Sequence, residues 1–137
     1  MSTFTTGEVA ALCGIPTKLL SMAVYTGAVT PALRGGLGKP HGWTARDVEA
    51  VWALHQLELL ASGIQPKGVQ RLRRYVWDAI HARAPWQTVV VVVPIQEPIV
   101  RLLEPLAVPG YVASLDAVSR IVSLERVTPM IAAGAPG

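Results

Sequence analysis

The segment from Phe4 to Tyr75 constrains the fold more than any other part of the chain. Two short helical patterns meet at Gly14, a Gly-rich basic stretch covers residues 30–43, and two longer amphipathic patterns follow. A short helix, a turn containing glycine and a second short helix form the helix-turn-helix pattern. Four glycines and two prolines within 30–43 exclude a helix there and favour two extended arms around a tip. The order predicts a small, mainly helical winged helix-turn-helix.

Local capping signals mark the expected helix ends. Thr5 with Glu8, and Thr44 with Asp47, have the spacing of N-terminal caps, in which side chains and backbone N–H groups three residues apart bond reciprocally. Glycine tolerates the left-handed conformation that stops a helix, and proline suits a first turn. The four helices are expected to begin at Thr5, Pro16, Thr44 and Pro66 and to end at Gly14, Gly27, Gly63 and Ala84.

The remainder of the chain changes character after Ala84-Pro85, which predicts a helix-turn-helix domain over 1–85 and a second unit over 86–137. Thr88–Val93 is a β-branched run, as in a strand that is buried on both faces. Residues 98–106 and 116–127 have helical apolar spacing, and 111–113 suggest a second strand. We expect a small α/β segment of βαβα order, right-handed if its strands are parallel neighbours, with a frayed tail over 128–137.

Composition bounds the class of protein. The 137 residues suffice for one domain or two small ones, and 51% apolar against 15% charged residues provides a core. Residues 1–86 hold nine Lys/Arg against five Asp/Glu, whereas 87–137 hold three against four, so the basic excess lies in the helix-turn-helix half. Cys13 is the single cysteine. We expect a cytoplasmic protein, with neither a secretory signal nor an apolar run of the roughly 20 residues that a membrane span needs.

Several motifs in residues 4–75 resemble the DNA-binding domain of the MerR family. Residues 5–16, TTGEVAALCGIP, are similar to the family's first helix and turn, and Leu20 falls on its second-helix leucine. Residues 43–48, WTARDV, and the Gly-Ile pair at 63–64 are similar to the junctions around its third helix. The resemblance implies a winged helix that binds duplex DNA. The chain departs from the family at 21–23, where arginine and aromatic residues usually stand, at 40–42, where the wing usually has an Arg pair, and in lacking the long dimerising helix.

The candidate DNA-binding residues follow from this arrangement. A recognition helix in the major groove would use the side chains off its apolar stripe, a wing would contact phosphate or the minor groove, and the basic residues of the fourth helix would clamp the backbone. The side chains expected on the recognition helix are Thr17, Lys18, Ser21 and Tyr25. Those expected on the wing are Arg34, Lys39 and His41, and those on the fourth helix are Arg71 and Arg74. Lys67 and Arg73 are expected to be exposed beside the last pair. An ordinary solvated surface is the alternative for each group.

The sequence predicts no catalytic, cofactor or metal site. Residues 34–39, RGGLGK, have the outline of a phosphate-binding loop, but Pro40 stands where Ser or Thr should follow. His41, His55 and His81 lack metal-ligand spacing, and Cys13 is expected to be a small buried hydrophobe.

The pattern favours a non-enzymatic, sequence-specific regulator of transcription that binds double-stranded DNA as a homodimer, assembled through residues 87–127. Two other classes stay open. One is a structural or assembly protein that uses the winged helix to dock another protein, and the other is a phage DNA-packaging or recombination accessory. Steep loss of affinity between about 50 and 200 mM salt would separate a phosphate-contacting protein from a docking module.

Overall fold

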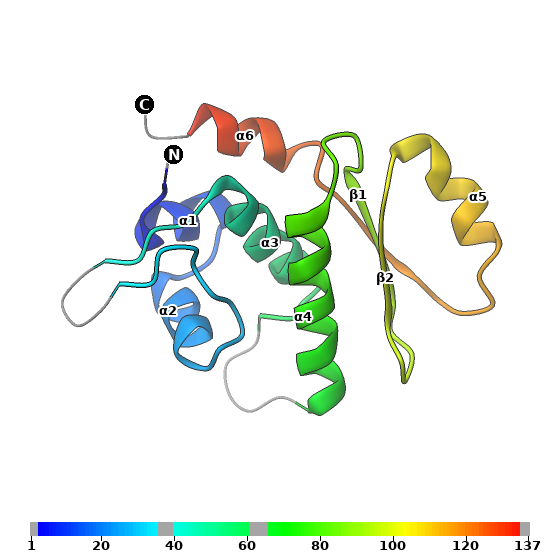
Figure 1. Cartoon of the computed structure of the whole chain (residues 1–137), viewed down its shortest axis with the longest axis horizontal. Coiled ribbons are helices and arrows are strands. Elements are labelled where there is room, and N and C mark those ends of the chain that lie inside the picture. Colours follow the sequence, from blue (N-terminus) through cyan, green and yellow to red (C-terminus); the bar gives the residue numbers. More distant parts are fainter. Residues whose placement is uncertain (1–2, 36–39, 61–65, 135–137) are drawn as a thin grey trace.

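The computed structural model describes residues 3–35, 40–60 and 66–134, and within these ranges it consists of six α-helices, a short 3-10 turn and a three-stranded sheet. Figure 1 shows α4 alongside the sheet, α5 on the other side of it, and α6 across the end of the molecule near α1. The elements, in order, are α1 (Thr6–Cys13), α2 (Thr17–Tyr25), α3 (Ala45–Gln56), α4 (Lys67–Ala82), β1 (Val89–Val93), β2 (Ile99–Leu103), the 3-10 turn η1 (Pro105–Ala107), α5 (Val108–Ala113), β3 (Arg120–Ser123) and α6 (Val127–Ala133).

The first two helices form a tight bent pair. The Thr5 hydroxyl accepts from the Glu8 N–H at 3.1 Å while the Glu8 carboxylate accepts from the Thr5 N–H at 2.9 Å, so the predicted capping box is confirmed. Gly14 ends α1 at φ 69°, a left-handed conformation that glycine adopts without strain. The two helix axes then differ by 117°. This angle lies within the range of helix-turn-helix units.

A pair of antiparallel bridges follows α2. Leu33 and Gly42 exchange backbone hydrogen bonds of 2.9 and 2.7 Å, and Phe4 and Trp43 exchange bonds of 2.7 and 2.9 Å. Trp43 is fully buried, and its indole N–H donates to the Thr6 hydroxyl at 3.1 Å. The extended arms expected on either side of the Gly-rich tip are therefore present at their base, and the tip itself lies outside the described residues.

Helix α3 begins as predicted and ends earlier than predicted. The Thr44–Asp47 capping box is present at its start. The helix stops at Gln56 rather than at Gly63, because Glu58 adopts φ 59° and the N–H groups of Glu58 and Leu59 turn back to the carbonyls of His55 and Leu54 at 3.0 and 2.8 Å. That is the Schellman pattern of a helix end, here with glutamate in the left-handed position that glycine usually fills.

The C-terminal segment differs from the expected βαβα unit. The predicted strand is confirmed as β1, and all five of its residues are buried. The predicted helix over 98–106 is wrong, because 99–103 form β2; the predicted strand over 111–113 lies within α5; and the predicted helix over 116–127 contains β3. Of the tail expected to fray, residues 128–133 instead lie in α6, in which Val127 and Ile131 are buried, and residues 135–137 lie outside the described residues.

The sheet is antiparallel, in the order β2-β1-β3. Val91 lies opposite Arg101 on one side and Ile121 on the other. The five residues 94–98 connect β1 to β2, and a parallel crossover needs a dozen or more. The connection therefore dictates a hairpin, and the right-handed parallel crossover considered from sequence does not arise.

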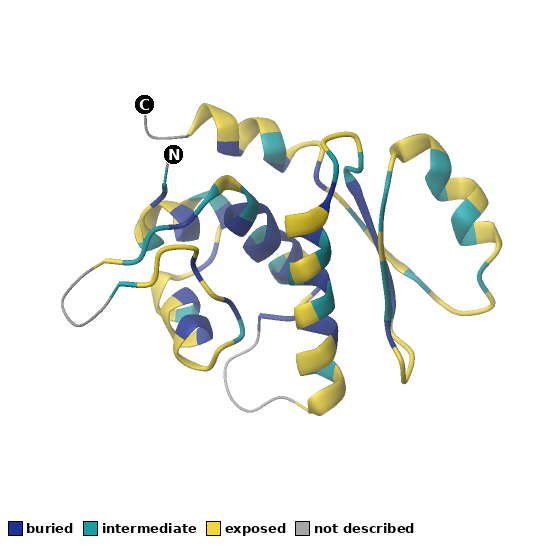
Figure 2. Ribbon diagram, viewed as in Figure 1, coloured by how far each residue is buried: buried dark blue, intermediate teal, exposed yellow. Residues whose placement is uncertain are grey.

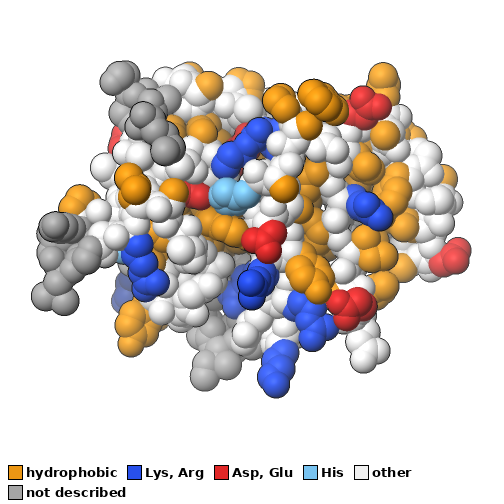
Figure 3. All heavy atoms as spheres, viewed as in Figure 1, with side chains coloured by type: hydrophobic (Ala, Val, Ile, Leu, Met, Phe, Trp, Pro, Cys, Tyr) orange, Lys and Arg blue, Asp and Glu red, His pale blue; other side chains and the backbone are white. Residues whose placement is uncertain are grey.

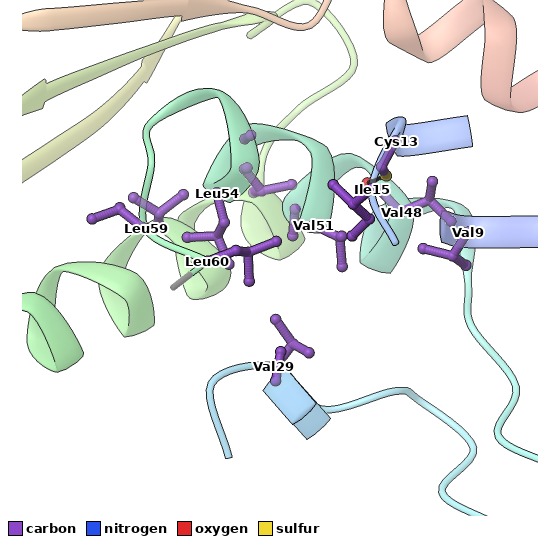
Figure 4. Packing of buried hydrophobic residues seen from close by; sticks show 14 of the residues in the cluster. Val9, Cys13, Ile15, Val29, Val48, Val51, Leu54, Leu59 and Leu60 are labelled. Carbon is purple, nitrogen blue, oxygen red and sulfur yellow. Dashed lines mark hydrogen bonds between the residues drawn. The ribbon is translucent and has the colours of Figure 1, made fainter. Parts of the chain in front are cut away.

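One apolar core joins both parts of the chain. Side chains from α1 and α3, together with Ile15, Val29, Leu59 and Leu60, converge in Figure 4. Val90 and Val92 of β1 belong to this core, whereas the alternate residues of β1 face the side of the sheet where α5 lies. Figure 2 shows the buried residues concentrated in β1, in α3 and along the inner side of α4.

A buried ionic cluster reinforces this junction. The Glu49 carboxylate of α3 accepts from Arg83 Nε at 3.2 Å and Nη2 at 2.7 Å, and from the Thr128 hydroxyl of α6 at 2.6 Å. The side chains of Glu49 and Arg83 are 4% and 2% exposed. Burial alone would raise the pKa of Glu49, but Arg83, Thr128 and Arg46 outweigh it and hold that pKa below its usual value. Helix α6 is thus attached to α3.

Candidate functional site

The exposed face of α2 carries four of the predicted DNA-contacting residues. Thr17, Lys18, Ser21 and Tyr25 are all exposed, while Leu20, Ala23 and Val24 face the core. At about 100° per residue the four exposed side chains span an arc of about 100°. Tyr25 is 84% exposed. The sequence prediction of one polar surface stripe on this helix is borne out as geometry, and its contact with DNA stays a prediction.

The three residues predicted to lie on a wing have different surroundings. Arg34 is exposed directly after the Leu33–Gly42 bridge. The ring of His41 is half-buried, and its Nδ1 accepts from the Gly35 N–H at 2.9 Å, which closes the base of the hairpin. Lys39 lies outside the described residues. Of the three residues predicted to contact phosphate here, Arg34 is therefore the one described as an exposed cation.

The two predicted arginines of α4 both face carboxylates. Arg71 Nη1 lies 3.2 Å from Glu97 Oε2, and Arg74 Nε lies 3.9 Å from Asp78 Oδ2. Their side chains are 45% and 82% exposed. Ion pairs this exposed are screened by solvent and contribute little, so a phosphate could displace either carboxylate.

The expectation that Arg73 is exposed is wrong. Arg73 is only 8% exposed, and no hydrogen bond or ion pair joins its guanidinium to any described residue. The sequence carried a signal for this: at about 100° per residue, Arg73 lies about 40° around the helix from Val69, inside the arc bounded by Leu72 and Trp77. Arg73 therefore belongs to the inward face of α4 by position, although its side chain is charged.

These α4 residues line a groove against the end of α2. The groove has a volume of about 870 Å³, and we call it the α2–α4 groove. It brings Tyr25 together with Arg71 and Arg74, which the sequence placed on separate elements, and it adds Arg73, which sequence reasoning assigned to the surface. On the face of the molecule drawn in Figure 3, Lys and Arg side chains are gathered over α4. The lining residues are Met22, Tyr25–Thr30, Lys67, Gln70, Arg71, Arg73, Arg74, Trp77 and Asp78.

A second polar network joins the wing arm, α3 and α4. Asp47, 2% exposed, accepts from the Ala32 N–H at 3.0 Å, from the Thr44 N–H at 2.9 Å and from the His81 ring Nε2 at 2.6 Å. The His81 Nδ1 faces the Trp77 carbonyl at 2.8 Å. Both ring nitrogens thus face acceptors, which requires the doubly protonated imidazolium.

The pKa values of this pair move apart. Burial would lower the pKa of His81, but its bonds to Asp47 and to the Trp77 carbonyl, with the nearby charges, raise it above the usual value. Burial would likewise raise the pKa of Asp47, but the His81 ring and the two backbone N–H groups outweigh it and hold the pKa lower. Through Asp47, this ion pair links the backbone at Ala32 to α4.

Within the described ranges no cluster of three or more His, Cys, Asp or Glu side chains could hold a metal ion. Cys13 is buried, as predicted, and its thiol donates to the Val48 carbonyl at 3.7 Å. Burial raises the pKa of this thiol to about 12. Across the described residues no single helix is long and apolar enough to cross a membrane; α1 and α2 pass that test only together, as a bent pair.

Comparison with known proteins adds no family assignment: no protein-family model matches the chain, and no curated protein matches it significantly.

Proposed function

We propose that the protein is a sequence-specific, double-stranded DNA-binding regulator of transcription with a winged helix-turn-helix, acting as a homodimer in the cytoplasm. The observation that carries the proposal is the exposed polar face of α2, with Lys18 near its N-terminal end and Ser21 one turn further on. A helix of this length fits the major groove of B-DNA, where side chains read base edges.

The neighbouring elements support this docking. The 117° bend after α1 leaves the outer face of α2 clear of α1, and Arg34 extends from the arm that follows it. A cation on a wing would contact phosphate beside the groove and set the register of the helix. The Asp47–His81 pair would keep that arm in a constant position relative to α4.

Open sheet edges support dimerisation. In the order β2-β1-β3, both outer strands have an edge without a partner strand among the described residues. Ile121 on β3 is 49% exposed, Val118 just before β3 is 84% exposed, and Leu106 just after β2 is 93% exposed. Unpaired edges with apolar side chains are templates for pairing with another chain. Two recognition helices would then reach half-sites roughly 34 Å apart.

Binding to a random duplex pool tests the proposal, by fluorescence anisotropy at about 50 and 200 mM salt, with sequencing of the bound fraction. We expect an enriched palindrome and a steep salt dependence. Lys18→Ala combined with Arg34→Ala should weaken binding, and loss of the Arg34 phosphate contact should reduce the slope of log affinity against log salt by about 1. The control is Arg126→Ala. It also removes one positive charge per substituted residue, but from an exposed position beside α6. Unchanged affinity in the double variant would refute the assignment of these contacts.

A protein-docking role is the second candidate. The pairing of Arg71 with Glu97 and of Arg74 with Asp78 reduces the cationic character of α4, and Tyr25 and Met22 are 84% and 40% exposed on adjoining positions of α2. Exposed aromatic and methionine side chains are enriched at protein interfaces. This role would be favoured if the protein does not bind duplex DNA at low salt but binds a partner protein with an affinity that does not change with salt concentration.

A further inference from the structure

Arg73 is a buried cation that the described part of the protein leaves without a partner. It is 8% exposed, and its Nε–H has no acceptor. Burial lowers the pKa of Arg73, but a guanidinium does not lose its proton in proteins. Since an unpaired buried charge is unfavourable, such a group calls for an explanation, and a bound ion is one.

The position of Arg73 supplies that explanation, because the side chain lines the α2–α4 groove. A volume of about 870 Å³ falls within the range of small-molecule sites, roughly 300 to 1,000 Å³. A ligand in the groove would lie between α4 and residues 26–30, the segment that follows α2.

The charges around the groove favour an anion. Lys67 stands at the first turn of the 16-residue helix α4 and has no ion pair with a described residue. Backbone N–H groups and the positive end of the helix dipole add to its charge there. Asp78 also lines the groove, but its side chain is 67% exposed and faces Arg74, which places it toward the rim. Lys67 and Arg73 are therefore two cations without a carboxylate partner in the described part of the chain.

The remaining lining adds an apolar, aromatic component. Trp77 is half-buried in the groove wall, and Tyr25 is exposed at its edge. Both side chains present ring surface against which a planar group can stack. Inorganic ions would leave this surface unused.

We propose that the α2–α4 groove binds a small phosphorylated compound with a planar aromatic part, its phosphate held by Arg73 and Lys67 and its ring against Trp77 or Tyr25. Arginine is suited to this task because its planar fork donates two parallel hydrogen bonds to a phosphate. The site does not depend on DNA binding, and it gives the proposed regulator a ligand pocket next to its recognition helix.

Titration of the full-length, ¹⁵N-labelled protein with adenosine monophosphate, inorganic phosphate and adenosine tests the proposal. We expect adenosine monophosphate to shift the resonances of α4 and of residues 25–30 and to bind more tightly than inorganic phosphate, with no binding of adenosine. Arg73→Met should weaken binding by about 10- to 100-fold, the loss of a hydrogen bond to a charged group. Lys67→Ala, at an exposed position where folding is not at risk, should weaken it by about two- to fivefold.

Arg126→Ala is the matched control and should bind like the wild type, because Arg126 is exposed beside α6. Equal affinity of Arg73→Met and the wild type would overturn the proposal, as would binding of adenosine as tight as that of its monophosphate. A short DNA duplex distinguishes the source of the phosphate. If the duplex displaces adenosine monophosphate and Arg73→Met weakens duplex binding equally, the groove holds a backbone phosphate of DNA, and the small-ligand proposal is wrong.

Discussion

The buried Glu49–Arg83 pair yields the sharpest prediction about stability. Glu49→Gln keeps the size of the side chain and removes its charge. The carboxylate now accepts four hydrogen bonds: from Arg83 Nε and Nη2, from Arg46 Nη1 at 2.8 Å and from the Thr128 hydroxyl at 2.6 Å. An amide in its place presents an N–H₂ group to one of these donors and leaves the Arg83 charge uncompensated.

The expected loss is large compared with the stability of a domain. Removing one partner of a buried ion pair costs about 3–5 kcal/mol, against about 5–15 kcal/mol for the whole free energy of unfolding. The Arg83 Nη1 group retains the carbonyls of Ala84 and Pro85 at 3.1 and 3.2 Å, so part of its charge remains hydrogen-bonded. We therefore expect about 3 kcal/mol, the lower end of that range.

Urea denaturation, followed by circular dichroism and by tryptophan fluorescence, measures this loss. The midpoint should fall while the slope of the free energy against urea stays constant. Glu97→Gln is the control, because Glu97 faces Arg71 in a pair whose carboxylate is 74% exposed, and it should change stability by less than about 1 kcal/mol. Replacing both members, with Glu49→Leu and Arg83→Met, should cost less than Glu49→Gln alone, since no buried charge is then unpaired.

The pH dependence provides an independent reading. The pKa of Glu49 is lower in the folded state than in the unfolded chain, so the pair stabilises the fold above the unfolded value and loses that effect as pH falls through the folded value. The difference between wild type and Glu49→Gln should narrow in acid. A difference below about 1 kcal/mol at pH 7, equal to that of Glu97→Gln, would refute the assignment of this cluster as a stabilising link between α3 and α6.

Three further predictions concern other groups. The pKa of His81 is raised by folding, so its bond to Asp47 stabilises the protein fully below the unfolded pKa of about 6.5, and this stabilisation is lost as pH rises through the folded pKa. In His81→Gln the free energy of unfolding, measured across that pH range, should no longer show this decline. If the decline persists in the variant, the pairing of His81 with Asp47 is contradicted. Glu58→Gly should raise the free energy of unfolding by about 1 kcal/mol, because φ 59° strains any residue with a Cβ, whereas Glu58→Ala should bring no such gain. The Cys13 thiol, with its pKa raised to about 12, should react with a disulfide reagent at pH 8 only when denaturant unfolds the chain, and fast reaction of the native protein would show that the thiol is accessible.

Interactions within four residues were predictable from sequence. Both capping boxes form as expected, at Thr5 and Thr44, because every atom of a capping box lies in one turn of chain. The left-handed end at Gly14 and the start of α4 after Pro66 have the same local origin. The end of α3 was missed because the residue in the left-handed position is Glu58, which carries no glycine signal.

The candidate site was predictable only in part. The stripe on α2 follows from helical periodicity, and so does the inward position of Arg73, which its charge obscured. That Arg71 would face Glu97, 26 residues further along the chain, follows from no local rule. The groove itself is lined by the end of α2, by residues 26–30 and by α4, which lie far apart in the sequence, and no periodicity within either helix contains that information.

By itself the sequence determined where the first four helices begin, where α1 and α2 end, and the buried strand β1, since each depends on side chains one or two turns apart. Only the tertiary structure decided the C-terminal topology. Residues 99–103 have apolar spacing that suits a helix, yet they pair with β1, because a strand buried on both faces has hydrogen-bonding groups along both edges that need partners. β3 supplies the other edge for the same reason. This strand pairing joins residues up to 34 positions apart, from Val89 to Ser123, and it outweighs the weak local preference of either segment.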